Sequence, residues 1–421
     1  MHQPRRSLII SGFCLCSAAF AATPVLAQAP APTPAPAATA PAAAPAKPAA
    51  LQVKVGVLRQ IHPRDPISIR DIPAPDDGIA GANLAASDNN TTGSFLNQHY
   101  SVEDAPVKPG ADPVAAFKAL LAHGVTLVLA DLSAADLIKV ADAAHGQDVL
   151  IFNISAPDDS LRAQDCRANV IHVAPSNAML ADAVAQYLIW KNWPRWLLVK
   201  GSHPADEQLA QAYEHSAKKF GGKIVDERTY VDPGGGKRSD TGMILIQKNM
   251  PLISQKAPDY DVLIAADDSQ VFGLNLPYRT WDARPVAGSG GLVPTSWDSS
   301  MDQWGATQLQ NSFADHFHRE MNKRDYNAWV AMRIIGDGVT HKNTGDPKVL
   351  HDYLLSDKFG IAAYKGQKLS LRPWDQQLRQ PILLSDGRTV VSAAPEPGFL
   401  HRTTTLDTLG VDKPESKCTL K

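Results

Sequence analysis

Polar side chains gather in loops that follow predicted strands, which is where open α/β sheets bind their ligands. These loops span 59–77, 131–133, 155–159, 200–206 and 267–270, and a sixth contains Ser289. Hydroxyls, carboxylates and helix N-termini in such loops suit a small polar ligand, whose anionic part can lie at a helix N-terminus. The candidate ligand-binding residues of these loops are Asp77, Ser133, Ser155, Ala156, Asp158, His203, Asp267, Asp268 and Ser289.

Each of these residues also has an ordinary structural explanation. Ser133 and Ser176 are typical N-caps of the helices that follow them, and Asp268 can simply be solvated. Tryptophans add a further candidate, because an aromatic ring in a cleft can pack against a ligand. Trp297 and Trp304 lie in a loosely patterned part of the chain, so both are cleft candidates, and Trp297 joins the predicted ligand-binding residues.

One segment approaches the motif of a serine hydrolase. Residues 287–291 (AGSGG) place Ser289 as in G-x-S-x-G, but the first glycine of the motif is missing. The segment 292–294 (LVP) follows, where a nucleophile elbow would continue into a helix. We therefore predict no catalytic residue, and a hydrolase that uses Ser289 is the remaining enzyme alternative.

Two further patterns do not fit the chemistry that they suggest. Residues 234–237 (GGGK) resemble a phosphate-binding loop, but Arg238 occupies the place of the required Ser or Thr. His316 and His318 are two residues apart, which on a helix directs them away from each other rather than toward one metal ion. The sequence therefore predicts no metal site and no cofactor.

Alternating strands and helices position these loops. Apolar runs typical of parallel strands occur at 51–58, 125–130, 148–154, 170–174, 196–199, 223–230, 260–266 and 285–287. Helical patterns occur between them at 76–90, 112–124, 133–144, 176–190 and 205–220. This alternation predicts an α/β fold with two Rossmann-like lobes of parallel strands and helices on both faces. Beyond Gly291 we expect helices at 326–340 and 347–356 and a hairpin at 382–393.

The N-terminal segment predicts export. Arg5 and Arg6 precede an apolar run at 7–22, and the small side chains near Ala27 suit signal peptidase, so we expect a mature chain from Gln28. A membrane anchor is the alternative, but the run is shorter than the roughly 20 residues that a bilayer core requires. Residues 29–50 are almost only Ala and Pro, which predicts a semi-rigid spacer.

Charge and cysteine content agree with an exported, non-nucleic-acid-binding protein. The chain has 41 basic and 43 acidic residues and no basic run, which argues against nucleic acid as a partner. After loss of the signal peptide only Cys166 and Cys418 remain. An even pair in an oxidising compartment favours one disulfide, and two unpaired thiols are the alternative.

Several longer strings indicate a family. The strand 51–58, the helix DDGIAGANLAASDNNTTG and the segment AAFKALLAHGVTLVLADLSAADLIKVADAA together resemble the type I periplasmic binding proteins, the solute receptors of branched-chain amino acid ABC transporters. The strings DDSLRAQDCRANVIHVAPS, LPYRTWDARPVAG, GLVPTSWD and SLRPWDQQLRQPILL resemble a branch of substrate-binding proteins associated with pyrroloquinoline quinone (PQQ)-dependent alcohol dehydrogenase systems.

The resemblance implies a ligand clamp that lacks the contacts of an amino-acid receptor. The hydroxyl that would hold a ligand carboxylate falls near Ser133, but the next anchor falls on Ala156-Pro157, which offers no hydroxyl and no proline N–H. The aromatic position of the second lobe falls near Ala205. The acid that would hold an ammonium group falls at 289–291, where no acid exists, so Asp267 and Asp268 are the candidates to replace it.

The resemblance also implies how the chain is organised and what it contacts. We expect a signal peptide at 1–27, a linker at 28–50, and two lobes discontinuous in sequence, 51–175 with 300–358 and 176–299 with 359–421. The implied partners are a small-molecule ligand, an ABC transporter permease in the inner membrane and a periplasmic dehydrogenase. An accessory or sensor protein that uses the same clamp on a protein partner is the alternative function.

Overall fold

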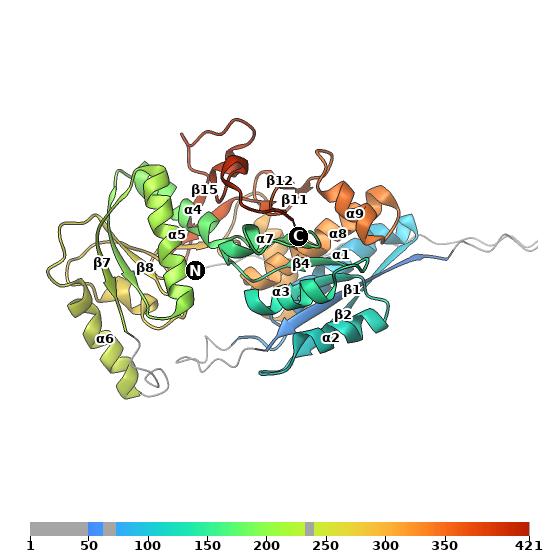
Figure 1. The fold of residues 1–421 in the computed structure, drawn as a ribbon, viewed down its shortest axis with the longest axis horizontal. Helices are drawn as coiled ribbons and strands as arrows, with labels where there is room; N and C mark the ends of the chain where they lie inside the picture. The colour runs from blue at the N-terminus through green and yellow to red at the C-terminus, as the bar shows by residue number, and fades with distance from the viewer. Residues whose placement is uncertain (1–48, 62–72, 232–239, 421) are drawn as a thin grey trace, which may run out of the picture. The chain divides into compact units, whose positions relative to one another are not determined.

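Two parallel sheets organise the chain as far as Gly288 (Figure 1). The first has the strand order β2-β1-β3-β4-β5 and the second β7-β6-β8-β9, and every pair within them is parallel. This arrangement confirms the predicted α/β fold with two parallel-sheet lobes. The strands are β1 (Leu51–Gln60), β2 (Gln98–Val107), β3 (Leu127–Asp131), β4 (Leu150–Asn153), β5 (Val170–His172), β6 (Arg195–Lys200), β7 (Lys223–Thr229), β8 (Val262–Ala266) and β9 (Val286–Gly288).

The computed structural model describes residues 49–61, 73–231 and 240–420, with the backbone alone for 240–244. The predicted signal peptide, almost all of the predicted spacer, most of the loop 59–77 and the segment 234–237 lie outside this part of the chain. Residues Ala49–Lys421 belong to one compact unit. No helix of the described residues is long and apolar enough to cross a membrane.

The first sheet is covered on both faces, as its uninterrupted apolar strands require. Because side chains alternate along a strand, Leu127 and Leu129 of β3 pack on one face and Val128 and Ala130 on the other. One face contacts α1 and α8, and we call this cluster the first core; the other contacts α2 and α3. The helices are α1 (Ile79–Leu96), α2 (Pro113–Ala122), α3 (Ala134–Ala143) and α8 (Lys323–Lys342).

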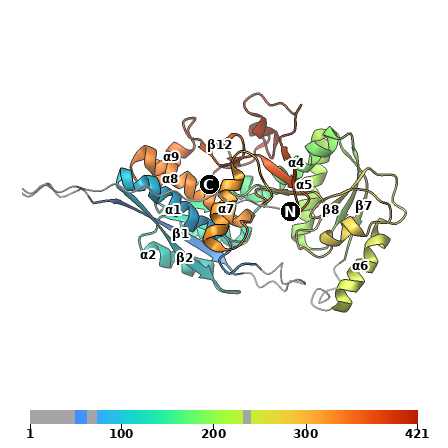
Figure 2. The same ribbon diagram turned by 180° about the vertical axis from the view of Figure 1, so that it is seen from behind.

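The second sheet is built in the same way. Trp196 and Leu198 of β6 pack toward α4 and α5 in what we call the second core, whereas Leu197 and Val199 pack toward α6 and the 3-10 helix η4. The elements are α4 (Asn177–Trp190), α5 (Pro204–Phe220), α6 (Asp240–Ser254) and η4 (Gly273–Tyr278), and Figure 2 shows them from behind. Ser176 caps α4 as predicted, since its hydroxyl accepts a hydrogen bond from the Met179 N–H at 3.2 Å.

The remaining elements close the two cores and connect them. Two small antiparallel sheets have the orders β10-β14-β15 and β11-β12-β13. The predicted hairpin is confirmed as β14 and β15, and the predicted helices at 326–340 and 347–356 are α8 and α9. The bounds are β10 (Val293–Thr295), α7 (Ala306–Phe317), α9 (Pro347–Leu354), β11 (Ile361–Ala362), β12 (Lys368–Leu371), β13 (Leu378–Arg379), β14 (Ile382–Ser385), β15 (Val390–Ala394), and the 3-10 helices η2 (Asp159–Arg162), η5 (Thr405–Thr408) and η6 (Lys413–Glu415).

Within the described residues, the chain passes between the two cores three times. It leaves the first core after Val173, returns between Leu292 and Trp297, and runs along β14, where Leu383 packs in the first core and Leu384 in the second. Core residues from Phe359 to Leu378 pack in the first core. The sequence assigned that stretch to the second lobe, and the difference arises because β11 contacts α8, β12 and β13 continue from β11, and residues of all three strands pack in the first core.

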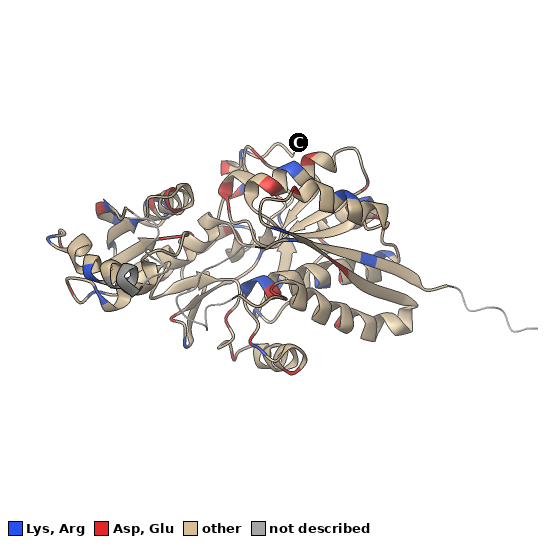
Figure 3. Cartoon of the chain, turned by 90° about the horizontal axis from the view of Figure 1, so that it is seen from below, with Lys and Arg blue, Asp and Glu red and all other residues tan. Residues whose placement is uncertain are grey.

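Acidic and basic residues are interspersed along the described part of the chain (Figure 3).

The C-terminal tail is fastened to both lobes. Lys219 and Asp182 of the second lobe bind the backbone of Gly410 at 2.8 Å each. Further along the tail, Cys418 forms a disulfide with Cys166, which precedes β5 of the first lobe, with 5.7 Å between their Cα atoms. This is the pairing that the sequence favours.

The disulfide should stabilise the fold, because it closes a loop of 252 residues. We expect the double variant C166S/C418S to lose unfolding free energy, by up to about 5 kcal/mol in loop-entropy models. Urea unfolding measures the loss. Reducing agent should lower the stability of the wild-type protein to that of the variant and leave the variant unchanged. Equal stability of the wild type and the variant in the absence of reducing agent would contradict the prediction.

A buried lysine lies beside the third crossing. Lys365 is 1% exposed, its Nζ donates to the Pro381 carbonyl at 2.8 Å, and it lies 5.1 Å from the centre of the Tyr326 ring. Burial lowers the pKa of Lys365 to about 7. An unfolded lysine has a pKa of about 10.4, so between these values the unfolded chain binds more protons than the folded one.

The stability of the protein should therefore rise with pH above about pH 7, with a slope approaching about 1.4 kcal/mol per pH unit from this group. The variant Lys365→Met keeps the apolar stem and removes the titrating amine, so it should lack this slope. Urea unfolding of both proteins from pH 6 to pH 9 tests this. If the unfolding free energies of the wild type and Lys365→Met change with pH in the same way over this range, deprotonation of Lys365 is not the cause of the pH dependence.

Candidate functional site

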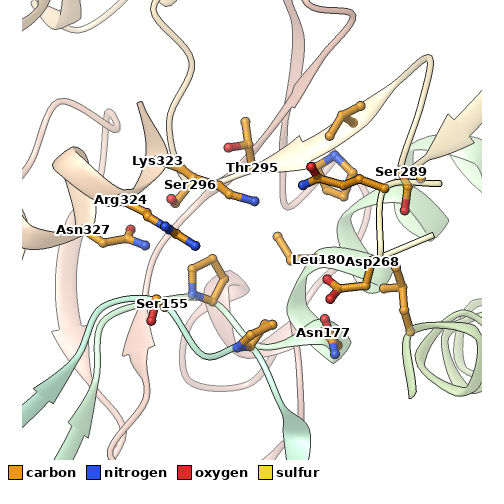
Figure 4. Close-up of a pocket in the computed structure, with 18 of the residues that line it drawn as sticks. Ser155, Asn177, Leu180, Asp268, Ser289, Thr295, Ser296, Lys323, Arg324 and Asn327 are labelled. Carbon is orange, nitrogen blue, oxygen red and sulfur yellow. The ribbon is translucent and has the colours of Figure 1, made fainter. Parts of the chain in front are cut away.

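A cavity of about 320 Å³ lies at the carboxyl ends of the strands of both lobes (Figure 4). Loops after β4, β8 and β9 contribute to its wall, together with β10 and the first turns of α4 and α8. Four predicted ligand-binding residues line it: Ser155, Asp267, Asp268 and Ser289. The other lining residues are Ile154, Pro157, Ala174, Pro175, Asn177, Leu180, Leu209, Tyr213, Gln270, Gly288, Val293, Pro294, Thr295, Ser296, Lys323, Arg324 and Asn327.

Asp267 builds the loop of the second lobe. Its carboxylate accepts hydrogen bonds from the N–H groups of Val271, Phe272 and Gly273 at 2.9, 2.7 and 2.6 Å. Its own N–H donates to the Ser289 hydroxyl at 2.9 Å. Desolvation raises the pKa of Asp267, and the three amides act in the opposite direction. The carboxylate is 1% exposed, so its oxygens serve the loop rather than an ammonium group in the cavity.

Asp268 is the acidic side chain that this loop presents to the cavity. It is exposed, and its carboxylate points inward from the second-lobe wall (Figure 4). Desolvation raises the pKa of Asp268, the Lys323 ammonium lowers it, and the carboxylates of Asp206, Asp158 and Asp267 raise it further. Of the two acids that the sequence offered, Asp268 is therefore the one that can contact a ligand.

The start of α8 forms the opposite wall. Asn322 caps this helix by accepting hydrogen bonds from the N–H groups of Arg324 and Asp325 at 2.8 and 3.1 Å. The cap fixes the first turn, and Lys323 and Arg324 extend from it into the cavity (Figure 4). One turn further, Asn327 donates from Nδ2 to the Ile154 carbonyl at 2.9 Å. Two cations of the first lobe thus face Asp268 of the second.

Five other predicted residues lie outside the lining of the cavity. Ser133 caps α3, and Ala156 exchanges hydrogen bonds with the Asn153 side chain. The Asp158 carbonyl accepts from Arg162 at 3.0 Å, and His203 forms the capping box of α5. Asp77 contacts the lining indirectly, because its carboxylate accepts a hydrogen bond from Arg324 at 3.5 Å. A role for these residues in ligand binding stays a prediction.

Trp297 packs in the first core instead of lining the cavity. It is 3% exposed, and its ring stacks on Tyr326 with 4.6 Å between ring centres and 11° between the planes. The loose pattern around Trp297 suggested a cleft position, but the chain enters the first core at this point, and the core buries the ring. Trp304, the other cleft candidate, is 49% exposed and lies in a separate groove beside Tyr364 and Trp329.

The basic wall of the cavity was not predicted from the sequence. Lys323 and Arg324 precede the predicted helix at 326–340, and a polar start of a helix usually indicates only a cap. The pattern Asn322-x-x-Asp325 is such a cap and could have located the first turn of α8. Among the described residues no group of three or more His, Cys, Asp or Glu side chains could hold a metal ion.

Comparisons with known proteins agree with this geometry. The model of a family described as periplasmic binding protein matches residues 76–245. No curated protein matches the sequence. The matching model is that of a binding-protein family, in agreement with the prediction that the chain is not an enzyme.

Solved structures of solute-binding proteins have the same fold. A branched-chain amino acid ABC transporter periplasmic ligand-binding protein from Burkholderia xenovorans superposes with a TM-score of 0.67 at 16% identity, covering 87% of this chain and 99% of that chain. An ABC transporter substrate-binding protein from Sphaerobacter thermophilus gives 0.65 at 18%, covering 82% and 98%. A solute-binding protein from R. palustris in complex with benzoate gives 0.61 at 15%, covering 88% and 100%.

These similarities identify the fold as that of the type I periplasmic binding proteins, as the sequence predicted. At these low sequence identities the solved structures establish the fold alone. The ligand of this chain has to be inferred from its own cavity.

The two neighbouring acids of the second-lobe loop should differ in their effect on stability. We expect Asp267→Asn to lower the free energy of unfolding by about 1–3 kcal/mol, because an amide cannot accept all three backbone N–H bonds. The exposed Asp268→Asn is the matched control and should stay within about 0.5 kcal/mol of the wild type. Urea unfolding distinguishes them, and equal losses would refute this division of roles.

Proposed function

We propose that the chain is an exported solute-binding protein of an ABC transporter, which binds a small ligand between its two lobes in the periplasm. The observation that carries the proposal is the cavity of about 320 Å³, lined by side chains of both lobes at the carboxyl ends of their strands. A ligand in this cavity would contact both lobes at once and would favour the closed arrangement by its higher affinity for it. No bond is made or broken in this mechanism.

Several observations support the transport role. The fold is shared with solute-binding proteins of ABC transporters, among them one in complex with leucine and one in complex with benzoate. The N-terminal segment predicts a cleaved signal peptide, which fits a periplasmic location and delivery to a permease of the inner membrane. The strings that resemble the PQQ-associated branch support a link to an alcohol oxidation system, in which the ligand would be an alcohol or its oxidation product.

The cavity itself argues against an α-amino acid as the ligand. Pro157 cannot donate a backbone hydrogen bond, and Asp267 already uses its carboxylate on three amides. Lys323 and Arg324 place positive charge where an ammonium group would be repelled, and Asp268 is the acid left on the other wall. The fold therefore supports solute binding, and the side chains support a ligand other than the branched-chain amino acids.

A thermal-shift screen of the mature chain tests this function. The panel contains branched-chain amino acids, short alcohols and their acids, aromatic acids and PQQ. A ligand at 100 times its dissociation constant should add about 2.7 kcal/mol to the unfolding free energy, which raises the melting temperature measurably. The variant Leu180→Trp, which fills part of the cavity, should abolish the shift, whereas Leu274→Trp at an exposed site should keep it.

A shift that survives in Leu180→Trp would place binding outside the cavity. A panel without any response would favour the accessory role, in which the same clamp binds a protein such as a periplasmic dehydrogenase. Pull-down with that dehydrogenase would then be the decisive measurement.

A further inference from the structure

Arg324 differs from other arginines of the first lobe in how little of its guanidinium group is used. Arg59 holds Asp104 with two hydrogen bonds of 2.8 and 2.9 Å, and Arg319 holds Asp325 with two of 2.6 and 3.0 Å. Among the described residues, the Arg324 side chain makes one hydrogen bond, at the long distance of 3.5 Å to Asp77. A guanidinium group has five N–H donors, so most of its donor capacity remains available.

The unused side of this group faces the cavity. Figure 4 shows the Arg324 and Lys323 side chains extending from the start of α8 into the space opposite Asp268. Arg324 also lies 3.8 Å from a carboxylate oxygen of the buried Asp131. The contacts with Asp77 and Asp131 are too long for paired hydrogen bonds, but they hold the guanidinium group in place. Arg324 is thus positioned and still able to bind an anion.

The segments after β3, β4 and β5 offer few other donors for an anion. The Ser133 N–H donates to the Gln60 side chain at 3.0 Å, and its hydroxyl is hydrogen-bonded to Asp136 at 3.1 Å. Pro157 has no N–H, and the Asn177 N–H donates to the Pro157 carbonyl at 2.8 Å. The donors that a hydroxyl-and-amide anchor would need are therefore absent or already occupied at these positions.

Asn327 gives a second, independent indication that this wall binds a polar group. It is 4% exposed and lies in the lining of the cavity, one turn of α8 after Arg324. Its Oδ1 has no hydrogen-bond partner among the described residues, although its Nδ2 is bound to Ile154. A buried acceptor without a partner costs free energy, and a ligand N–H or O–H beside Arg324 would recover it.

We propose that the ligand is a small organic monoacid whose carboxylate is held by Arg324, with Lys323 adding positive charge, in place of the anchor that Pro157 removes. This inference rests on the proposed function and adds the chemical class of the ligand. A guanidinium group matches a carboxylate with two parallel hydrogen bonds, which gives such a pair both strength and direction. The Leu180, Leu209 and Tyr213 side chains supply an apolar surface for the body of the ligand.

The opposite wall limits the ligand to one negative charge. Asp268 points into the cavity from the second lobe, and the Asp206, Asp158 and Asp267 carboxylates are near enough to raise its pKa. A second carboxylate on the ligand would meet this negative wall and be repelled. The far end of the ligand should therefore carry no negative charge and can offer a hydrogen-bond donor to Asp268. The two walls together select monocarboxylates over dicarboxylates.

Isothermal titration calorimetry with matched sets of compounds tests the proposal on the mature chain. The probes are benzoate, benzamide and benzyl alcohol, and lactate, lactamide and propane-1,2-diol, with succinate as the dicarboxylate. In at least one set the acid should bind at least tenfold more tightly than its amide and alcohol, and succinate should bind more weakly than that acid. The variant Asp268→Asn should improve the binding of succinate relative to the monoacid.

Variants separate the role of Arg324 from a general loss of structure. Arg324→Gln should weaken binding of the acid tenfold or more and remove its preference over the amide, while Arg388→Gln, on an exposed hairpin, should change neither. Circular dichroism shows whether Arg324→Gln folds. If it does not fold, the proposal is still tested by Lys323→Gln and by the comparison of acid with amide binding to the wild-type protein. Lys323→Gln should weaken the acid selectively.

The outcomes distinguish this inference from the proposed function. Equal affinity for acid and amide, or unchanged acid binding in Arg324→Gln, would overturn the inference while leaving solute binding intact. Binding of an alcohol or amide without any acid would do the same. No response to any compound, charged or neutral, would contradict the proposed function and this inference with it.

Discussion

A buried ion cluster links the C-terminal tail, which packs in the second core, to the strands β12 and β13 that pack in the first core. One oxygen of Asp407 accepts from Nε of Arg372 at 2.9 Å and from Nε of Arg379 at 2.8 Å, and Arg372 also donates to the Leu409 carbonyl at 2.6 Å. Arg372 and Asp407 are each 1% exposed. Loss of one partner in such a cluster leaves an uncompensated buried charge, which costs about 3–5 kcal/mol. Arg379 lies at the end of β13, shortly before β14 begins, and β14 pairs with the cavity-lining β10.

The charges of the cavity divide into those that build the fold and those that remain for a ligand. Asp267 lies at a strand end, where ligands bind in such sheets, but three backbone amides use its carboxylate. Arg324 is held by two distant acids and keeps most of its donors. In the proposed function, this contrast accounts for a specificity that differs from that of amino-acid receptors: the same loops form, while the cations that would hold the ligand come from α8.

Strong local patterns made most of the fold predictable. The buried strands β3 and β8 are short apolar runs, and the caps Asp112 and Ser176 mark the starts of α2 and α4. Among the described residues, the sequence analysis missed the short strands β10 to β13 and three longer elements, β2, α6 and α7, whose patterns are weak. Strand β2 (QHYSVEDAPV) is an edge strand with many exposed polar residues, α6 contains Pro251, and α7 starts after Gly305, whose left-handed backbone is not visible in a sequence.

The sequence by itself determined the α/β class, the two parallel-sheet lobes and the loops in which a site could lie, because hydrophobic periodicity and caps act over a few residues. It also singled out four residues of the cavity wall, Ser155, Asp267, Asp268 and Ser289. Only the tertiary structure decided that Asp267 is used by its own loop, that Trp297 packs in the core, and that Arg324 faces Asp268. These outcomes depend on contacts between segments far apart in sequence, where burial and hydrogen bonding are settled by the packing of whole elements rather than by local pattern.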